Sequence, residues 1–508
     1  MLHTISVNFL ASRIENLQEI IPDLRTRVLS DSLSTICELL VEGAVDILMC
    51  YSHHTFAPMI DVTRDPRWGR IAESLGEDPF LASQFAAAMV RGYQGEDLTA
   101  IGTIAACAKH FAGYGAVESG RDYATTNVPE NELRNVYLPP FKAAVDAGVR
   151  TLMTSFSDLD GVPATGNAFL LRQVLREEWG FDGFVVSDWD SIRQLQIHGL
   201  TANDRESAFE AVTAGVNMEM HGDAYTNHLA ELIEDGRIEV ELVDRAVASI
   251  LRVKFELGLF ENPYTDPEGF PPFANDEALE TARKAALHSV VMLTNEHNVL
   301  PLSAARLETL AVIGPLADTP YEQLGTWIFD GDPQYSVTPL QAIRDLVGKS
   351  TDVRYLRTLE ISRSKDTSAF DEAASIAAES DAVVLFLGEE SILSGEAHSR
   401  ADISLPGAQA ELVRRVRETG TPVAAVILAG RPLTLSNIVD EVDGVDVVVE
   451  PASGDPFFLG FDGGSHYPPA NEILDPALVA LASGATGYLR PDDATYAFVM
   501  FSKRITQD

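Results

Sequence analysis

The stretch Gly183-Phe-Val-Val-Ser-Asp-Trp189 leads three apolar residues into a serine, the single carboxylate of Asp188 and a tryptophan. A short apolar run of this kind is typical of a buried parallel strand, and the residues that follow it lie at the carboxyl edge of the sheet. In a (β/α) barrel that edge forms the mouth of the active site. The stretch therefore predicts that Asp188 lies in a functional site.

Other segments of the first half have the same form. Apolar runs that end in polar or charged residues occur at 54–61, 105–108 and 151–156. Helical patterns lie between or after them, at 79–93, 132–147, 167–179 and 205–214. Strands that alternate with helices indicate a parallel sheet, and polar strand ends on this repeating pattern favour an α/β fold of the (β/α)8-type TIM barrel.

A second α/β unit follows the first. The helical pattern at 239–256 precedes a proline-rich stretch, so residues 261–278 are interpreted as a linker. Alternation then resumes, with helices expected at 278–294, 368–379 and 407–418 and strands at 310–314, 382–388, 422–428 and 445–450. We expect a barrel domain over 1–260 with atypical or missing first strands, an αβα sandwich over 279–450 and an atypical tail over 451–508.

Composition narrows the class of protein. The chain has 508 residues, 46% of them hydrophobic, and a formal net charge of -39. Such acidity argues against nucleic-acid binding, which needs clustered Lys and Arg, and suits a neutral small-molecule ligand. No stretch is long and apolar enough for a membrane span, and residues 1–15 lack the pattern of a signal peptide. As written, the sequence predicts a cytoplasmic protein, or a periplasmic or secreted one if an N-terminal segment was lost.

The three cysteines, Cys37, Cys50 and Cys107, are odd in number and widely spaced. This pattern indicates neither a disulfide framework nor a zinc ribbon, so we expect buried free thiols.

Charged and aromatic residues gather near the expected barrel mouth. These residues are Trp68, Arg70, Lys109, His110, Arg121 and Trp189. A lone Asp at a strand end is more often a cap or an ion-pair partner than a nucleophile, but this company favours a functional Asp188. Charged hydrogen-bonding groups beside an aromatic face are what a sugar ring requires.

A second carboxylate is provided by the loop Ser394-Gly-Glu-Ala-His-Ser-Arg400, which follows the expected strand 382–388. The loop can be read as a solvated acidic segment, because Glu389 and Glu390 lie just upstream. If Glu396 instead meets Asp188, the two carboxylates define a cleft between two domains.

Six motifs in one order carry a family resemblance. They are Phe56-Ala-Pro-Met-Ile-Asp-Val-Thr-Arg-Asp-Pro-Arg-Trp-Gly-Arg70, Gly76-Glu-Asp-Pro79, Lys109-His-Phe111, Gly120-Arg-Asp122, Gly180-Phe-Asp-Gly-Phe-Val-Val-Ser-Asp-Trp189 and Ser394-Gly-Glu396 with Ser399-Arg400. Over about residues 52–440 the chain resembles glycoside hydrolase family 3, and within it the bacterial β-glucosidase and β-xylosidase branch. The resemblance implies a barrel plus an αβα sandwich, with retaining hydrolysis of β-linked sugars from the non-reducing end.

The resemblance also implies roles for individual residues. Asp188 corresponds to the nucleophile and Glu396 to the general acid/base. The expected substrate-binding residues are Arg70, Lys109, His110, Arg121, Phe156 and Trp189. Small-molecule β-glucosides or oligosaccharides are the implied ligands, and neither a metal nor an organic cofactor is required.

Retaining hydrolysis needs an ionised and a protonated carboxyl group about 5 to 5.5 Å apart. We expect Arg70 and Lys109 to favour the ionised form of Asp188. Like charge from Glu389 and Glu390 would favour the protonated form of Glu396.

The sequence departs from the family at both ends. Residues 1–51 lack the Asp-x-x-His-Gly motif whose Asp grips the outer sugar hydroxyls, and residues 441–508 lack the usual glycine-rich continuation. A catalytically inactive family 3 remnant is therefore an alternative, as is a β-xylosidase. An open barrel would also expose strand edges, which favours self-association into a homo-oligomer.

Two further alternatives are weaker. The β-N-acetylglucosaminidase branch uses Lys-His-Phe-Pro-Gly-His, whereas this chain has Lys109-His-Phe-Ala-Gly-Tyr114. Nucleotide binding by Val312-Ile-Gly-Pro-Leu-Ala-Asp318 is not supported, because one glycine after a strand falls short of a G-x-G-x-x-G loop.

Overall fold

A computed structural model describes residues 53–100, 102–263, 275–295, 299–327, 333–439 and 442–449. The expectations for residues 1–51 and 451–508, including Cys37 and Cys50, lie outside these ranges.

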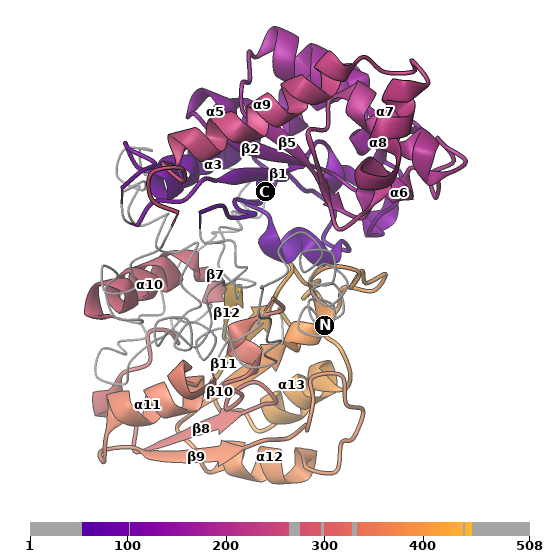
Figure 1. Cartoon of the computed structure of the whole chain (residues 1–508). Helices are drawn as coiled ribbons and strands as arrows, with labels where there is room; N and C mark the ends of the chain where they lie inside the picture. Colours follow the sequence, from indigo (N-terminus) through magenta and orange to yellow (C-terminus); the bar gives the residue numbers. More distant parts are fainter. Residues whose placement is uncertain are drawn as a thin grey trace, which may run out of the picture. The chain divides into compact units, whose positions relative to one another are not determined.

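The first half contains a four-stranded parallel sheet in the order β1-β2-β5-β6 (Figure 1). Its strands are β1 (Cys107–Phe111), β2 (Thr151–Thr154), β5 (Phe184–Trp189) and β6 (Met218–Met220). The main helical segments of this half are α3 (Pro79–Gln94), α5 (Pro139–Asp146), the π-helical η6 (Phe169–Glu178), α7 (Asp204–Ala214), α8 (Ala224–Glu234) and α9 (Val240–Glu256). Parallel strands separated by helices match the barrel-type pattern.

Alternate strand residues of this sheet pack in two different clusters. Ala108, Leu152 and Val185 join the cluster that contains residues of α3, α5, η6 and α7. Their neighbours Cys107, Met153 and Val186 pack instead with Val253 of α9 and with Leu257, which follows that helix. Because both faces are buried around β2 and β5, these two strands are apolar in their interior, and their polar residues fall at the ends. Burial also raises the pKa of the free Cys107 thiol to about 12, so the expectation of a buried thiol is confirmed for this residue.

The segment before β1 runs parallel to that strand without forming a regular ladder. Bridges join His54 to Ala105 and Met59 to Lys109, and the Ala57 and Pro58 carbonyls accept hydrogen bonds at 2.7 and 3.0 Å. Pro58 has no N–H to donate, which explains the interrupted pairing. The segment nevertheless ends at Asp61, beside the end of β1.

The second half contains a six-stranded sheet in the order β7-β12-β11-β10-β8-β9. Its strands are β7 (Val291–Asn295), β8 (Thr309–Ile313), β9 (Asp352–Leu356), β10 (Ala382–Gly388), β11 (Val423–Ala429) and β12 (Gly444–Val449). All pairs are parallel except β7 with β12. The helices of this half are α10 (Asp276–Ser289), α11 (Pro339–Val347), α12 (Phe370–Ala378) and α13 (Gln409–Arg417).

This sheet is covered on both faces. Val383 and Leu385 of β10 pack in a cluster with residues of α12 and α13, whereas Val384 and Phe386 pack with Leu340 and Ile343 of α11. Figure 1 shows α12 and α13 beside this sheet, with α11 set apart from them. The arrangement is the αβα sandwich that the sequence predicts, and the α/β fold class is confirmed.

Several expected elements differ in detail. The helix expected at 278–294 ends at Ser289, because Val291 begins the antiparallel strand β7. The helix expected at 132–147 is divided into short segments, with α5 beginning at the paired prolines Pro139 and Pro140. Strands β6 and β9 and helices α8 and α11 were not expected. The domain boundaries proposed at 260 and 278 stay a prediction.

In the described part of the chain, every helix is too short or too polar to span a lipid bilayer.

Gly388 is the last residue of β10 and lies against the backbone of Leu428 in β11. A Cβ atom at this residue would lie 1.8 Å from the Leu428 carbonyl oxygen, and its φ is +134°. We expect Gly388→Ala to destabilise the fold by several kcal/mol, on the order of the largest single-site effects. Gly348→Ala is the control, because its φ of +59° costs about 1 to 2 kcal/mol but no atom lies within 4 Å. Equal urea midpoints for the two variants would contradict this account.

Candidate active site

Asp188 lies at the carboxyl end of β5 and is only 7% exposed. Its Oδ1 accepts a hydrogen bond of 2.6 Å from the Trp189 backbone N–H. Its Oδ2 has no hydrogen-bond partner among the described residues and lies 3.6 Å from Nε2 of His110. The strand therefore ends in one buried carboxylate oxygen that has no hydrogen-bond partner among the described residues.

His110 comes from β1 and is held by Asp61, at the end of the preceding segment. Asp61 Oδ2 accepts the His110 backbone N–H at 3.0 Å and lies 2.8 Å from His110 Nδ1. Both residues are at most 1% exposed. Burial, together with the nearby charges of Arg70 and Lys109, lowers the pKa of His110 well below its usual value.

Arg70 forms a buried bidentate ion pair with Glu73. The guanidinium donates from Nε and Nη2 to the two carboxylate oxygens at 2.7 and 2.9 Å. Burial opposes the charge on Arg70, but Glu73 outweighs it and keeps the pKa of Arg70 well above its ordinary value. The cation also lies 5.6 Å from the ring centre of Tyr114.

Burial dominates the ionisation of Asp188. It raises the pKa of Asp188 to about 7, against the lowering effect of Arg70, the Trp189 N–H and Lys109. The expectation that the two cations favour ionisation is thus correct in direction but not in net effect. The cause is the desolvation of a carboxyl group that has few hydrogen-bond donors around it.

Glu396 reaches the barrel residues from the loop that follows η12 (Ser391–Leu393). The Tyr123 hydroxyl donates a hydrogen bond of 2.5 Å to its Oε1. Its negative charge also acts on Asp188, whose pKa is raised first by burial and then, in part, by Glu396. The reading of this loop as a freely solvated segment is therefore wrong.

The neighbouring backbone ties the loop in place. Asp122 Oδ2 accepts the Ala397 N–H at 2.7 Å, and the Asp122 N–H donates to Ser399 Oγ at 3.2 Å. Gly395 N–H donates to the Gly69 carbonyl at 2.8 Å, so the loop also contacts the segment that carries Arg70.

Glu389 and Glu390, which precede Glu396 in the chain, both have partners of their own. Glu389 binds both Arg400 and Arg431, and Glu390 accepts the Ser362 hydroxyl at 2.7 Å and pairs with Arg363 at 3.5 Å. Both carboxylates bind residues that are distant in the sequence or lie on other segments. The spacing of residues along the chain could not predict these contacts.

Arg431 joins the two halves of the site and is completely buried. Its Nη1 donates to the carbonyls of Pro66, Arg67 and Trp68 at 2.9, 3.1 and 3.3 Å. Its Nη2 donates to the carbonyls of Leu393 and His398 at 2.5 and 2.8 Å, and its Nε binds Glu389 at 3.2 Å. One guanidinium therefore holds the Arg70 segment and the Glu396 loop together.

The aromatic residues separate into exposed and buried groups. Trp189 is partly exposed and stacks on His221, with ring centres 3.8 Å apart and planes 13° apart. Phe156 is 6% exposed and meets Tyr123 edge to face at 5.2 Å. Trp68 is fully buried and donates from Nε1 to Asp122, so it does not offer a ring face to a ligand.

The structure brings together most, but not all, of the expected residues. Asp188, His110 and Arg70 share one charged cluster, which Glu396 and Lys109 also influence. Arg121 instead lies at the surface, 65% exposed, and pairs with Glu118 at 3.9 Å. The following residues Asp122 and Tyr123 make the contacts to the Glu396 loop. The sequence did contain a signal for Asp122, because this residue belongs to the motif Gly120-Arg-Asp122.

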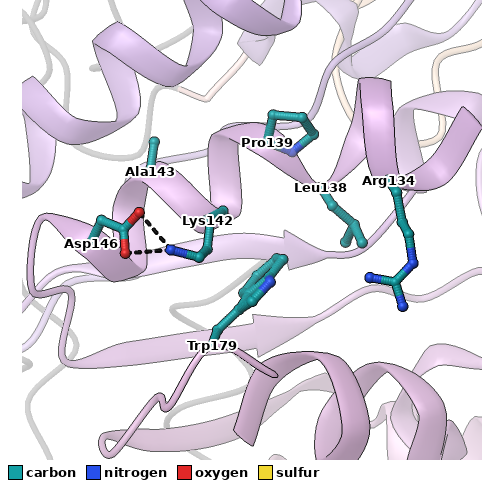
Figure 2. Close-up of a pocket in the computed structure, with 7 residues that line it drawn as sticks. All are labelled: Arg134, Leu138, Pro139, Lys142, Ala143, Asp146 and Trp179. Carbon is teal, nitrogen blue, oxygen red and sulfur yellow. Dashed lines mark hydrogen bonds and ion pairs between the residues drawn. The ribbon is translucent and has the colours of Figure 1, made fainter. Parts of the chain in front are cut away.

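A separate hollow of about 360 Å³ lies elsewhere on the first half of the chain (Figure 2). Its lining residues are Arg134, Leu138, Pro139, Lys142, Ala143, Asp146 and Trp179. Lys142 is already paired with Asp146 at 2.5 Å, and Arg134 with Glu178 at 2.7 Å. The hollow is not lined by Asp188, His110 or Arg70, and its two cations already have acidic partners. The cluster around Asp188 is therefore the better candidate for the site.

Over the described ranges, no group of three or more His, Cys, Asp or Glu residues is placed to hold a metal ion.

The raised pKa of Asp188 predicts a pH-dependent cost to stability. The unfolded carboxyl ionises near pH 4, whereas the folded one ionises at about pH 7. The folded state thus binds more protons between these values, and ionisation of Asp188 reduces stability progressively as pH rises through this window. We expect Asp188→Asn to raise the free energy of unfolding in urea more at pH 8.5 than at pH 5, by a difference on the order of a few kcal/mol at most.

The matched control for this prediction is Asp146→Asn, which alters a carboxylate that is 62% exposed. A stabilisation by Asp188→Asn that is the same at both pH values would show that burial does not raise the pKa of Asp188.

Arg431 predicts a large stability effect of its own. Arg431→Gln would remove one cationic partner of Glu389 and the guanidinium hydrogen bonds to five backbone carbonyls. We therefore expect the free energy of unfolding in urea to fall by about 3 to 5 kcal/mol. Arg363→Gln is the comparison, because its pair with Glu390 is half-exposed and worth less than about 1 kcal/mol. Similar urea midpoints for both variants would contradict the view that Arg431 holds the Arg70 segment and the Glu396 loop together.

Comparison with known proteins agrees with this two-part fold. Residues 33–253 match the model of the glycosyl hydrolase family 3 N terminal domain, and residues 290–452 match that of the family's C-terminal domain. A periplasmic beta-glucosidase of Salmonella typhimurium is 37% identical over 436 residues, covering 81% of this chain and 56% of the relative. A beta-xylosidase of Formosa agariphila is 37% identical over 409 residues, covering 77% and 56%.

Solved structures give the same result. The beta-glucosidase of Listeria innocua in complex with glucose is 38% identical, with a TM-score of 0.75 over 80% of this chain and 55% of that chain. Its complex with isofagomine gives 39% identity and a TM-score of 0.74, over 79% and 56%. The chain thus spans little more than half the length of these relatives. With both family models matched in order, the chain belongs to glycoside hydrolase family 3.

Proposed function

We propose that this chain acts as a retaining, exo-acting β-glycosidase that hydrolyses terminal non-reducing β-D-glucosyl residues. The observation that carries the proposal is the convergence of two carboxyl groups from the two halves of the chain. Asp188 has one unpartnered, buried oxygen, and Glu396 is held at the same site by Tyr123. The names of the Salmonella and Listeria relatives support glucosides as substrates.

The mechanism assigns one role to each carboxyl group. Asp188 attacks the anomeric carbon, the glycosidic C–O bond breaks, and Glu396 transfers its proton to the leaving oxygen. Glu396 then removes a proton from a water molecule, whose oxygen attacks the same carbon and releases Asp188. Configuration is retained, because two displacements occur at one centre.

The surroundings suit a neutral sugar. Arg70, Lys109 and His110 provide hydrogen-bonding groups close to Asp188, and the partly exposed ring of Trp189 provides an apolar surface. Tyr123 binds the acid/base carboxyl from the side of the barrel domain. Phe156, packed against Tyr123, fixes the position of that ring.

Two other candidates have a specific basis. The Formosa relative is a beta-xylosidase at the same identity, which favours xylosides as alternative substrates. A catalytically inactive family member is the other, since residues 1–51 lack the Asp-x-x-His-Gly motif.

The test is hydrolysis of nitrophenyl β-glucoside and nitrophenyl β-xyloside by the purified chain. We expect faster release from the glucoside, and a loss of at least about a thousandfold in kcat for Asp188→Ala, because the nucleophile is removed. Glu396→Ala should lose activity that azide restores with formation of a glycosyl azide, since azide needs no general base.

The control is Asp146→Ala, an exposed carboxylate of the same domain that should leave both rates unchanged. A faster xyloside reaction would favour the β-xylosidase alternative. A folded parent without activity on either substrate would overturn the proposal in favour of the inactive alternative.

A further inference from the structure

Asp122 accepts hydrogen bonds from donors on two sides, and the mechanism above gives it no role. On one side, its Oδ1 accepts from Nε1 of Trp68 at 3.1 Å and from the Tyr114 hydroxyl. On the other side, its Oδ2 accepts the backbone N–H of Ala397 at 2.7 Å, across 275 positions of the chain. Trp68 and Tyr114 are fully buried, so the core of the first half of the chain fixes the first side.

These contacts require both oxygens of Asp122 to accept. An indole N–H and a backbone N–H can only donate. The Trp68 N–H lies at Oδ1 and the Ala397 N–H at Oδ2, so the site needs a side chain with an acceptor at each position. A carboxylate provides two acceptors, whereas the amide of Asn would turn its NH₂ group toward one of the two N–H donors.

The Ala397 contact lies directly beside the proposed acid/base. Ala397 follows Glu396 in the sequence and has a φ of +60°, a left-handed value that residues with a Cβ atom rarely adopt. Such a backbone persists only where the surrounding contacts determine it. The Asp122 carboxylate provides one of these contacts, so its loss would free the turn that directs the Glu396 side chain.

Tyr123 extends the same arrangement to the carboxyl group of Glu396. Its hydroxyl donates to Oε1 of Glu396 at 2.5 Å, and its ring meets Phe156 edge to face at 5.2 Å. Tyr123 also has a left-handed backbone, with a φ of +63°, and its N–H donates to Oδ1 of Asp122 at 3.2 Å. Asp122 therefore binds both the residue after Glu396 and the residue that holds the Glu396 carboxyl group.

Other contacts hold the loop at different residues. The Gly395 N–H donates to the Gly69 carbonyl at 2.8 Å, and Arg431 binds the carbonyls of Leu393 and His398. These bonds fix where the loop begins and turns back. The Asp122 bond acts at the position next to Glu396, so it bears on the direction of this side chain.

We propose that Asp122 is a positioning residue that holds the Glu396 carboxyl group in place through the Ala397 N–H and Tyr123. Its catalytic consequence rests on the proposed glycosidase function, in which Glu396 must reach the leaving oxygen. The conformation of the loop does not depend on turnover, so it can be measured separately.

The first experiment is hydrogen–deuterium exchange of the full chain, resolved to the Ala397 amide. We expect this amide to exchange about 10- to 100-fold faster in Asp122→Asn than in the wild type, because a hydrogen bond to a charged acceptor is lost. Asp122→Ala, which removes both acceptors, should give at least the same increase. The matched control is Asp160→Asn, since Asp160 accepts the Val128 N–H at 3.1 Å, and it should leave the Ala397 rate unchanged.

The second experiment compares two aryl β-glucosides. A phenyl leaving group needs the proton of Glu396, whereas a dinitrophenyl leaving group departs without it. We expect Asp122→Asn to lower kcat/KM at least about tenfold for the phenyl glucoside and less than about twofold for the dinitrophenyl glucoside. A general loss of folded protein would lower both values equally.

Unchanged exchange of the Ala397 amide in folded Asp122→Ala, or an equal loss on both glucosides, would overturn the proposal. If neither variant folds, the wild type decides, because an Ala397 amide that exchanges as fast as an unstructured peptide contradicts its bond to Asp122. A wild-type chain that hydrolyses neither glucoside but shows the expected exchange rates would overturn the glycosidase function and leave the role of Asp122 in the loop intact.

Discussion

The candidate site depends on the buried guanidinium of Arg431. Its donors satisfy carbonyls of the Pro66–Trp68 segment, which precedes Arg70, and carbonyls of Leu393 and His398, which flank Glu396. Arginine is suited to this position because its planar fork provides five N–H donors and keeps its charge when buried. This cation therefore holds the segment before Arg70 against the loop that carries Glu396.

Two opposing effects act on the Asp188 carboxyl group: nearby cations and strong desolvation by burial. Arg70 and Lys109 favour negative charge on Asp188, but burial outweighs them and moves its pKa to about 7. The carboxyl group of Asp188 is therefore ionised only in part near neutral pH, and it is poorly solvated when it is ionised. The paired Arg70 and Glu73 show the opposite outcome, since two good hydrogen bonds keep both groups charged in the same surroundings.

Much of this arrangement could be predicted from the sequence. Apolar runs located β5, β8, β10 and β11, because buried parallel strands need apolar residues on both faces. Chain pattern could not find β7, whose pairing is antiparallel and whose residues continue a helical periodicity. Among site residues, motif order identified Asp188 and Glu396. It could not identify Asp61, Tyr123 or Arg431, whose importance arises from contacts between distant segments, and it selected Arg121 where Asp122 makes the contact.

The contact between Arg431 and Pro66 joins residues that are 365 positions apart in the chain. Closing so long a loop costs conformational entropy before any contact in it can stabilise the fold. During synthesis the Pro66–Trp68 segment leaves the ribosome long before its guanidinium partner exists. The contacts that join the Pro66–Trp68 segment to the Glu396 loop can therefore be completed only after Arg431 has been synthesised.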